Sequence, residues 1–192
     1  MKYILDFDEV LFNTTALKAK MAELGISEEE RGLEVFDRIA KLDPTFDFKS
    51  LVFPGAVKFL TEHGSDCIIV SSASSRHAEN NTDLEKQIEF QTEKIALSCI
   101  KDFRCRVEVV GVSKTEKLAE LKKEFDRTEE ELIFLDDRER YVREAKELGI
   151  RSVWMDREGK GYITNAEGVP TMLEFQRVGS CTEFGELVKN WQ

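Results

Sequence analysis

The stretch KYILDFDEVLFNT, residues 2–14, places an apolar run directly before a group of acids. Tyr3, Ile4 and Leu5 predict a short buried strand, and Asp6 and Asp8 follow it with one residue between them. The chain then becomes apolar again. The pattern raises the question of why a buried strand delivers two carboxylates to its own end.

Four further runs of apolar or β-branched residues predict buried strands. With the first run, they cover residues 3–5, 67–70, 107–110, 132–135 and 152–155. Helical patterns lie between them: one near residue 54, then 82–100, 114–125 and 140–148. Because strands alternate with helices, we expect an α/β fold with a doubly wound parallel sheet. The tail is expected to end in a strand around 173–178 and a helix over 182–189.

Two Ser/Thr-x-x-Glu pairs have the pattern of a capping box and predict helix starts. They are Ser27 with Glu30, and Thr82 with Glu85. The first pair lies within residues 14–50, which intrude between the first strand and the helix near residue 54 and read as a two-helix insertion. We therefore expect residues 1–13 and 51–192 to form the core and residues 14–50 to form a small helical insertion.

The composition excludes several classes of partner. The 192 residues include 38 acids and 28 Lys and Arg, for a net charge of −10. Such a surface repels nucleic acid and anionic membranes, so we expect neither as a partner. No apolar run approaches the roughly 18 residues of a membrane span. The four cysteines show no CxxC spacing, which favours reduced thiols in a cytoplasmic protein, and the oligomeric state stays open.

Polar residues follow four of the five expected strands. Ligands of an open parallel sheet bind beyond the carboxyl ends of its strands, so these residues are expected to meet there. They are Asp6 and Asp8, Ser71, Lys114, and Asp136 with Asp137. Carboxylates that converge repel one another unless a cation joins them, and Mg²⁺ prefers carboxylate and backbone oxygens. A lysine and a hydroxyl beside that cation suit the oxygens of a phosphoryl group.

In type and order, these residues resemble the four motifs of the haloacid dehalogenase superfamily. The motifs are DFDEV at 6–10, IIVS at 68–71, Lys114 ahead of a helix, and LDD at 135–137. The stretches LVFPGAVKFL at 51–60 and REAKELGIRSV at 143–153 resemble the helices that usually follow the cap and the last motif. The resemblance covers about residues 2–156. It implies a Rossmann-like core with strand order 3-2-1-4-5, and it makes the insertion over 14–50 a small helical cap.

The resemblance also implies an activity, that of a phosphatase acting on a small phosphorylated metabolite. Asp6 would be the nucleophile that forms an aspartyl-phosphate. Asp8 would protonate the leaving oxygen and then take a proton from the hydrolytic water. Ser71 and Lys114 would hold the phosphoryl oxygens. Ser72 is an alternative to Ser71.

The same resemblance implies a Mg²⁺ site. Asp6, the backbone carbonyl of Asp8, and Asp136 would hold the ion, and Asp137 would support it directly or through water. The lysine assignment keeps an alternative in Lys117, three residues after Lys114.

Carbon–halogen cleavage and a non-catalytic role are the two alternatives to phosphatase activity. The dehalogenases of the superfamily lack the second acid of the first motif, so Asp8 favours phosphoryl transfer over carbon–halogen cleavage. A non-catalytic or regulatory protein that binds a ligand or partner is the alternative to an enzyme. The sequence does not define which phosphate ester is used.

Overall fold

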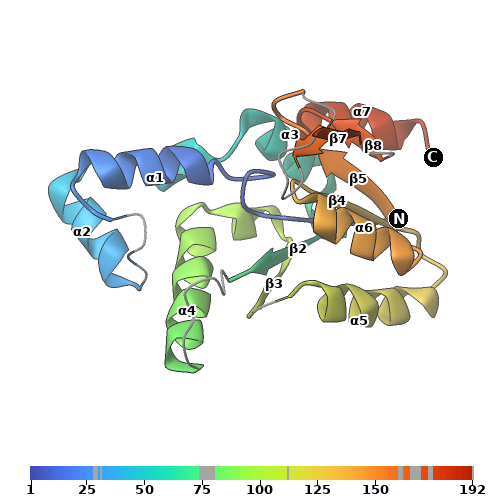
Figure 1. Ribbon diagram of the computed structural model, residues 1–192, viewed down its shortest axis with the longest axis horizontal. Coiled ribbons are helices and arrows are strands. Elements are labelled where there is room, and N and C mark those ends of the chain that lie inside the picture. The colour runs from blue at the N-terminus through green and yellow to red at the C-terminus, as the bar shows by residue number, and fades with distance from the viewer. Residues whose placement is uncertain are drawn as a thin grey trace.

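Six parallel strands form the central sheet of the computed structural model, in the order β3-β2-β1-β4-β5-β8 (Figure 1). They are β1 (Lys2–Leu5), β2 (Cys67–Ser72), β3 (Arg106–Val110), β4 (Leu132–Asp136), β5 (Arg151–Met155) and β8 (Gln176–Val178). The structure describes residues 1–27, 30, 32–73, 81–111, 113–159, 162–164, 170–172 and 175–191. The predicted parallel sheet and its order 3-2-1-4-5 are confirmed, and β8 extends it by one strand.

The first strand occupies a central place in this sheet. Leu5, its last residue, is in register with Ile69 of β2 on one side and with Leu135 of β4 on the other. The carboxyl end of β1 therefore opens between the carboxyl ends of β2 and β4, and residues that follow these three strands are brought together.

Helices cover both faces of the sheet (Figure 1). On one face lie α3 (Pro54–His63) and α7 (Cys181–Lys189), and on the other lie α5 (Thr115–Asp126) and α6 (Glu139–Glu147). Side chains of a strand alternate between the two faces of the sheet. Tyr3 packs edge-on against Phe59 of α3, with ring centroids 5.2 Å apart. Ile4, on the other face, joins the core cluster that contains Leu118 and Tyr141. The two apolar clusters fix the sheet from both sides.

Two helices, α1 (Thr14–Glu23) and α2 (Glu34–Leu42), occupy the stretch in which a two-helix insertion is predicted. They lie together at one end of the molecule, with α4 (Asn81–Leu97) beside them (Figure 1). Phe36 of α2 stacks on Phe90 of α4 with ring centroids 4.7 Å apart, which ties the pair to the rest of the chain. The division into a core and a cap at residues 14 and 50 stays a prediction.

The helix starts predicted from the capping boxes are wrong, the first of them by more than one turn. A hydrogen bond typical of the first box is present, since the backbone N–H of Ser27 donates to Glu30 Oε1 at 2.9 Å. The helix nevertheless begins only at Glu34, because Gly32 has a φ of 128° that no helix accommodates. At the second box, α4 begins at Asn81, one residue ahead of Thr82.

The predicted end of α4 near residue 100 is also late. The helix ends at Leu97, and Cys99 adopts a left-handed φ of 57° just beyond it. A 3₁₀ helix, η4 (Ile100–Phe103), then leads to β3. Two other 3₁₀ helices are η1 (Phe48–Leu51), after α2, and η2 (Gly64–Asp66), after α3.

The tail contains more structure than the sequence predicts. An antiparallel pair, β6 (Tyr162–Thr164) and β7 (Pro170–Met172), precedes β8. The strand predicted over 173–178 is present as Gln176–Val178, and residues 173 and 174 lie outside the described part of the chain. The helix predicted over 182–189 is confirmed as α7, which Ser180 caps by accepting a hydrogen bond from the backbone N–H of Glu183. Among the described helices, none combines the length and apolarity that crossing a bilayer requires.

Candidate active site

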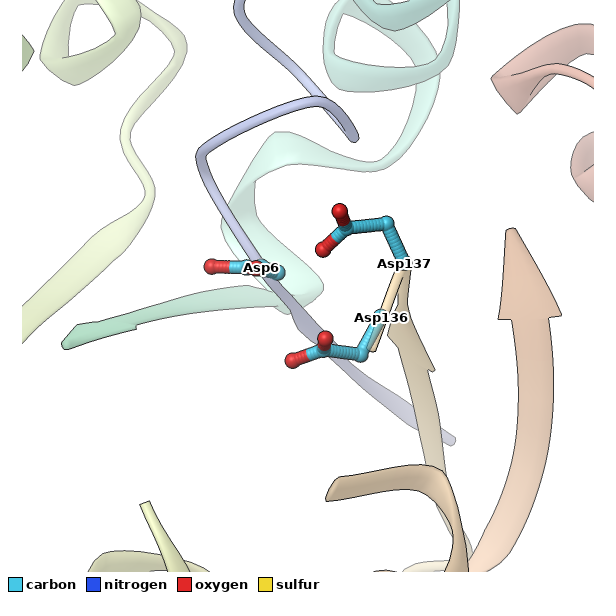
Figure 2. Close-up of side chains that lie close together, drawn as sticks. All are labelled: Asp6, Asp136 and Asp137. Atoms are coloured by element: carbon cyan, nitrogen blue, oxygen red, sulfur yellow. The ribbon is translucent and has the colours of Figure 1, made fainter. Parts of the chain in front are cut away.

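The two acidic strand ends meet where β1 and β4 lie side by side. Asp6 follows β1, and its backbone N–H donates to the carbonyl of Leu135 at 2.9 Å, so it still follows the line of the sheet. Asp136 is the last residue of β4, and Asp137 comes next. Each of the three acids offers a carboxylate oxygen within 4.8 Å of the other two. Figure 2 shows Asp136 and Asp137 turned from the end of β4 toward the side where Asp6 lies.

Backbone N–H groups hold two of these carboxylates in place. Asp6 Oδ1 accepts a hydrogen bond from the N–H of Phe7 at 2.6 Å, and Asp136 Oδ1 accepts one from the N–H of Arg138 at 2.8 Å. Both acids are buried. The carboxylates are therefore oriented by the backbone before any ligand arrives.

Lys114 supplies the cation of this cluster. It precedes α5, its side chain is only 1% exposed, and its Nζ lies 2.7 Å from Asp6 Oδ1 and 2.6 Å from Asp136 Oδ2. Burial lowers the pKa of Lys114, but the two carboxylates outweigh it and raise that pKa above its ordinary value. Lys114 is thus a buried cation shared between two acids.

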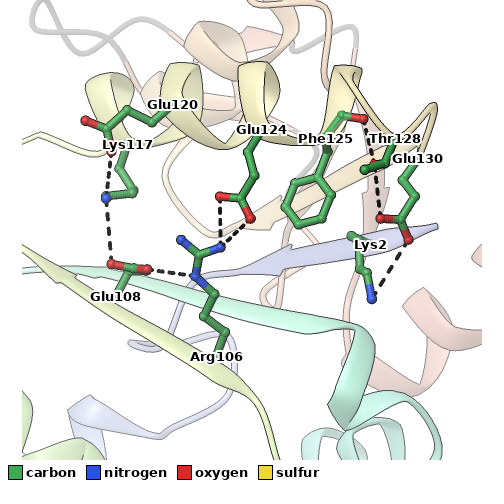
Figure 3. A network of polar contacts seen from close by, with 9 residues as sticks. All are labelled: Lys2, Arg106, Glu108, Lys117, Glu120, Glu124, Phe125, Thr128 and Glu130. Atoms are coloured by element: carbon green, nitrogen blue, oxygen red, sulfur yellow. Dashed lines mark hydrogen bonds and ion pairs between the residues drawn. The ribbon is translucent and has the colours of Figure 1, made fainter.

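Lys117, the alternative lysine, lies elsewhere. Its Nζ is 2.7 Å from Glu120 and 3.7 Å from Glu108, in a charged network that joins α5 to the edge strand β3 (Figure 3). Arg106 completes that network through Glu108 and Glu124. Of the two lysines, the structure brings only Lys114 to the acids.

Burial and mutual repulsion make protons bind more tightly to this cluster. Burial first, and then the charge of Asp136, raise the pKa of Asp6 well above its ordinary value. The same two causes raise the pKa of Asp137 to about 7. Asp137 Oδ1 is buried and has no hydrogen-bond partner among the described residues. The cluster thus carries more negative charge than Lys114 neutralises.

The carboxylate of Asp8 faces a different set of partners. Lys94 Nζ lies 2.5 Å from Asp8 Oδ1, and Gln91 Nε2 donates to Asp8 Oδ2 at 2.8 Å. Thr14 Oγ1 donates to the same carboxylate. Burial raises the pKa of Asp8, but the charge of Lys94 and these hydrogen bonds outweigh it, so that the pKa lies below its ordinary value. The proposed role of the Asp8 backbone carbonyl as a metal ligand stays a prediction.

Ser71 joins Asp8 through a shared partner. Ser71 lies in β2, is fully buried, and its Oγ accepts a hydrogen bond from Gln91 Nε2 at 2.7 Å. Both hydrogens of the Gln91 amide are thereby used, one on each residue. Ser72, the alternative, lines the adjoining cavity.

Sequence reasoning missed Gln91 and Lys94. Both lie on α4 and both are buried, with their polar ends at the residues that follow β1. The available signal was their spacing, since Gln87, Gln91 and Lys94 recur at intervals of four and three and so share one helix face. Without knowing that this face points to the strand ends, a polar stripe reads as a solvated surface.

A cavity of about 460 Å³ adjoins the acids, within the size range of small-molecule sites. Asp8, Asp137 and Arg138 lie at its sheet side. Most of the rest of its wall comes from two helices, with Leu17, Lys18 and Met21 of α1 and Gln87, Phe90, Gln91 and Lys94 of α4. A ligand that reaches Asp6 therefore has space to lie between α1 and α4.

Arg157 secures the turn that follows Asp8. Glu9 has a left-handed φ of 57°, so the chain reverses there. Arg157, just beyond β5, donates to the carbonyl of Val10 at 2.6 Å through Nη2 and to the carbonyl of Glu9 through Nε. Its guanidinium also lies 3.6 Å from the ring centroid of Phe53. A residue far along the chain thus holds the backbone next to Asp8.

Comparison with known proteins identifies the fold. Neither models of protein families nor curated proteins match the sequence. Solved structures do match, among them a haloacid dehalogenase-like hydrolase from Burkholderia xenovorans LB400, with 17% identity, a TM-score of 0.62, and coverage of 98% of this chain and 96% of that one. This chain has the fold of the haloacid dehalogenase-like hydrolases.

Two other structures with the haloacid dehalogenase-like fold differ in the chemistry that their names describe. The L-2-haloacid dehalogenase from Xanthobacter autotrophicus has 12% identity and a TM-score of 0.59, with 98% of both chains covered. The D,D-heptose 1,7-bisphosphate phosphatase from B. bronchiseptica, complexed with magnesium and phosphate, has 11% identity and a TM-score of 0.56, with all of both chains covered. The haloacid dehalogenase-like fold therefore accommodates both reactions, and the side chains must decide between them.

Proposed function

We propose that this protein is a Mg²⁺-dependent phosphatase that hydrolyses a small phosphorylated metabolite through an aspartyl-phosphate on Asp6. The observation that carries the proposal is the convergence of Asp6, Asp136 and Asp137 around buried Lys114 at the carboxyl ends of β1 and β4. Phosphoryl transfer needs positioning and charge neutralisation, and this group supplies both. The fold of haloacid dehalogenase-like hydrolases supports a hydrolytic reaction.

The residues fit a divalent metal ion. Three carboxylates lie within 4.8 Å of one another, and one oxygen of Asp137 is buried without a hydrogen-bond partner in the described part of the chain. An all-oxygen donor set suits Mg²⁺. Asp6, Asp136 and the backbone carbonyl of Asp8 would hold the ion, with Asp137 in support. When bound, it supplies positive charge to the phosphoryl oxygens.

The first chemical step belongs to Asp6 and Asp8. A carboxylate oxygen of Asp6 bonds to phosphorus while the ester P–O bond breaks, and the leaving oxygen takes its proton from Asp8. Lys114 Nζ, 2.7 Å from Asp6 Oδ1, would contact the phosphoryl group that Asp6 receives. Ser71 Oγ would contact the same group from β2.

The second step releases phosphate. Asp8, now a carboxylate, takes a proton from water as the water oxygen bonds to phosphorus and the Asp6–phosphorus bond breaks. Lys94 and Gln91 hold the Asp8 carboxylate in both steps. The residue thus alternates between acid and base without leaving its hydrogen bonds.

Asp8 also favours a phosphate ester over a carbon–halogen bond as the target. A halide leaves as a stable anion and needs no proton donor, whereas an alcohol leaves poorly unless its oxygen is protonated. A part-buried carboxyl two residues beyond the nucleophile supplies that proton. The cavity of about 460 Å³ and the net charge of −10 favour a small phosphorylated substrate over a nucleic acid.

Phosphate release from sugar phosphates, nucleotides and phospho-acids in the presence of Mg²⁺ tests this proposal. Wild type is compared with Asp6→Asn and with Asp126→Asn, the same change at an exposed position of α5. We expect turnover that vanishes in Asp6→Asn and with a chelator but persists in Asp126→Asn. If folded wild type released phosphate from no ester, the protein would instead be a ligand-binding or regulatory protein.

A further inference from the structure

Helix α4 turns three buried polar side chains toward the cavity. Gln87, Gln91 and Lys94 are 6%, 5% and 3% exposed, and all three line the cavity wall. Their spacing of four and three places them on one side of the helix. Burying polar groups costs free energy unless they form hydrogen bonds or ion pairs. Each of these three side chains therefore needs a polar partner.

Two of the three have partners in the protein. Lys94 pairs with Asp8, and Gln91 bridges Asp8 and Ser71. The orientation of the Gln91 amide follows from these contacts, because an ionised carboxylate can only accept and therefore faces Nε2. These two residues belong to the reaction centre.

Gln87 is different. Its Oε1 is buried and has no hydrogen-bond partner among the described residues, although the side chain lines the cavity. A buried acceptor left without a donor costs about 1–3 kcal/mol. A ligand in the cavity that carries a hydrogen-bond donor would satisfy this oxygen.

The position of Gln87 defines where that donor lies on the ligand. Gln87 precedes Gln91 by one turn of α4, a rise of about 6 Å along the axis. Gln91 contacts Asp8, the proposed proton donor to the leaving oxygen, so Gln87 would face a part of the leaving group a few bonds away. Leu17 and Met21 of α1 provide an apolar wall opposite, which suits a carbon skeleton.

We propose that Gln87 is a specificity-determining residue that accepts a hydrogen bond from a hydroxyl of the leaving alcohol. The enzyme then prefers phosphate monoesters of small polyols over esters that lack this hydroxyl. The inference rests on the proposed phosphatase function. An ammonium group could also donate to Gln87, but Lys94 on the same face and Lys18 across the cavity disfavour a second cation there.

A matched pair of esters tests the inference. Glycerol 3-phosphate and propyl phosphate have the same carbon chain and differ in their hydroxyls. We expect wild type to prefer glycerol 3-phosphate by about tenfold in kcat/KM, equivalent to about 1.4 kcal/mol for one good hydrogen bond. Gln87→Met should bring the ratio to within about twofold, mainly by slowing glycerol 3-phosphate. Gln176→Met, the same change at an exposed position of β8, should keep the wild-type ratio.

Calorimetric titration of both esters separates this inference from the proposed function. Tighter binding of glycerol 3-phosphate by wild type, lost in Gln87→Met, supports the inference even in a protein that turns neither ester over. Turnover of both esters with no preference in wild type, or a preference unchanged by Gln87→Met, overturns the inference and leaves the phosphatase intact. Equal binding of the two esters without turnover overturns the inference, whereas the proposed function falls only when no ester of the wider panel is hydrolysed.

Discussion

Lys94 Nζ lies 2.5 Å from Asp8 Oδ1, so the proposed proton donor of the reaction is paired with a cation from a helix that follows the second strand. The side chain of Lys94 is 4% exposed, and the pair is therefore poorly screened by solvent. Burial alone would raise the pKa of Asp8, and Lys94 is the largest influence that lowers it. The pair sets how readily Asp8 holds the proton that it must deliver.

Replacing Lys94 should shift the pH dependence of the reaction. Lys94→Met removes the charge that lowers the pKa of Asp8, so this pKa rises. Because the first step needs protonated Asp8, kcat/KM falls as pH rises through that pKa, and the alkaline limb of the profile should move to higher pH in the variant. The measurement is kcat/KM against pH at saturating Mg²⁺.

Lys94→Arg is the matched control, because it keeps a cation near Asp8. Its alkaline limb should stay close to that of wild type even where the rate itself drops. An alkaline limb at the same pH in Lys94→Met and wild type would mean that Asp8 is not the acid of the first step.

Removing Lys114 should destabilise the metal-free protein strongly. Lys114→Met leaves the buried carboxylates of Asp6 and Asp136 without their cation, a change that typically costs about 3–5 kcal/mol. Mg²⁺ neutralises the same carboxylates, so saturating metal should recover part of the loss. Urea unfolding with and without Mg²⁺ measures both effects.

Lys117→Met provides the comparison, since Lys117 forms its ion pairs at the surface of α5. Its free energy of unfolding should change by less than about 1 kcal/mol, with or without Mg²⁺. Equal losses in the two variants would show that the Lys114 contacts contribute no more than surface pairs.

The sequence predicts the acids of this site because topology alone brings them together. A residue after β1 must lie beside a residue after β4 once the two strands pair in parallel, and Asp6 and Asp136 follow from the apolar runs before them. Predicting Lys94 as a site residue would require knowing which face of α4 turns toward the carboxyl ends of the strands. The rotation of α4 about its axis is set by packing such as the Phe36–Phe90 stack. These two residues are 54 positions apart, so the contact leaves no local pattern in the sequence.

Local backbone geometry accounts for the wrong helix boundaries. The Ser27–Glu30 pattern is present and its backbone hydrogen bond forms, but Gly32 stands two residues further on and turns the chain out of the helical region. The sequence shows the glycine without showing that its φ is positive. Gly32, which lies outside the four-residue capping pattern, therefore delays the start of the helix.

The stability of the metal-free protein should fall as pH rises toward neutrality because of Asp137. Burial and the charge of Asp136 raise the pKa of Asp137 to about 7, whereas the unfolded chain has the ordinary value of about 3.9. Between these values the folded protein keeps a proton that the unfolded chain has lost, so the free energy of unfolding decreases with increasing pH. Urea unfolding at about pH 5 and about pH 8 measures this slope.

Asp137→Asn should flatten that slope, since the amide does not titrate. Mg²⁺ should have a similar effect on wild type, because a bound cation favours the ionised carboxylate. A variant with the full wild-type slope would assign the pH dependence to other groups.

Arg157 should be required for the turn beside Asp8. Arg157→Met removes the donors to the carbonyls of Glu9 and Val10, and hydrogen bonds from a charged group contribute about 1.5–3 kcal/mol each when buried, less at this half-buried site. We expect a loss of about 2 kcal/mol in the free energy of unfolding, together with a lower kcat as Asp8 loses its fixed position. Arg157→Lys should recover little of either, because an ammonium cannot donate in a planar fork to two carbonyls while lying over the ring of Phe53. Thermal unfolding and kcat are measured on the same preparations, and wild-type values in Arg157→Lys would show that only charge matters at this position.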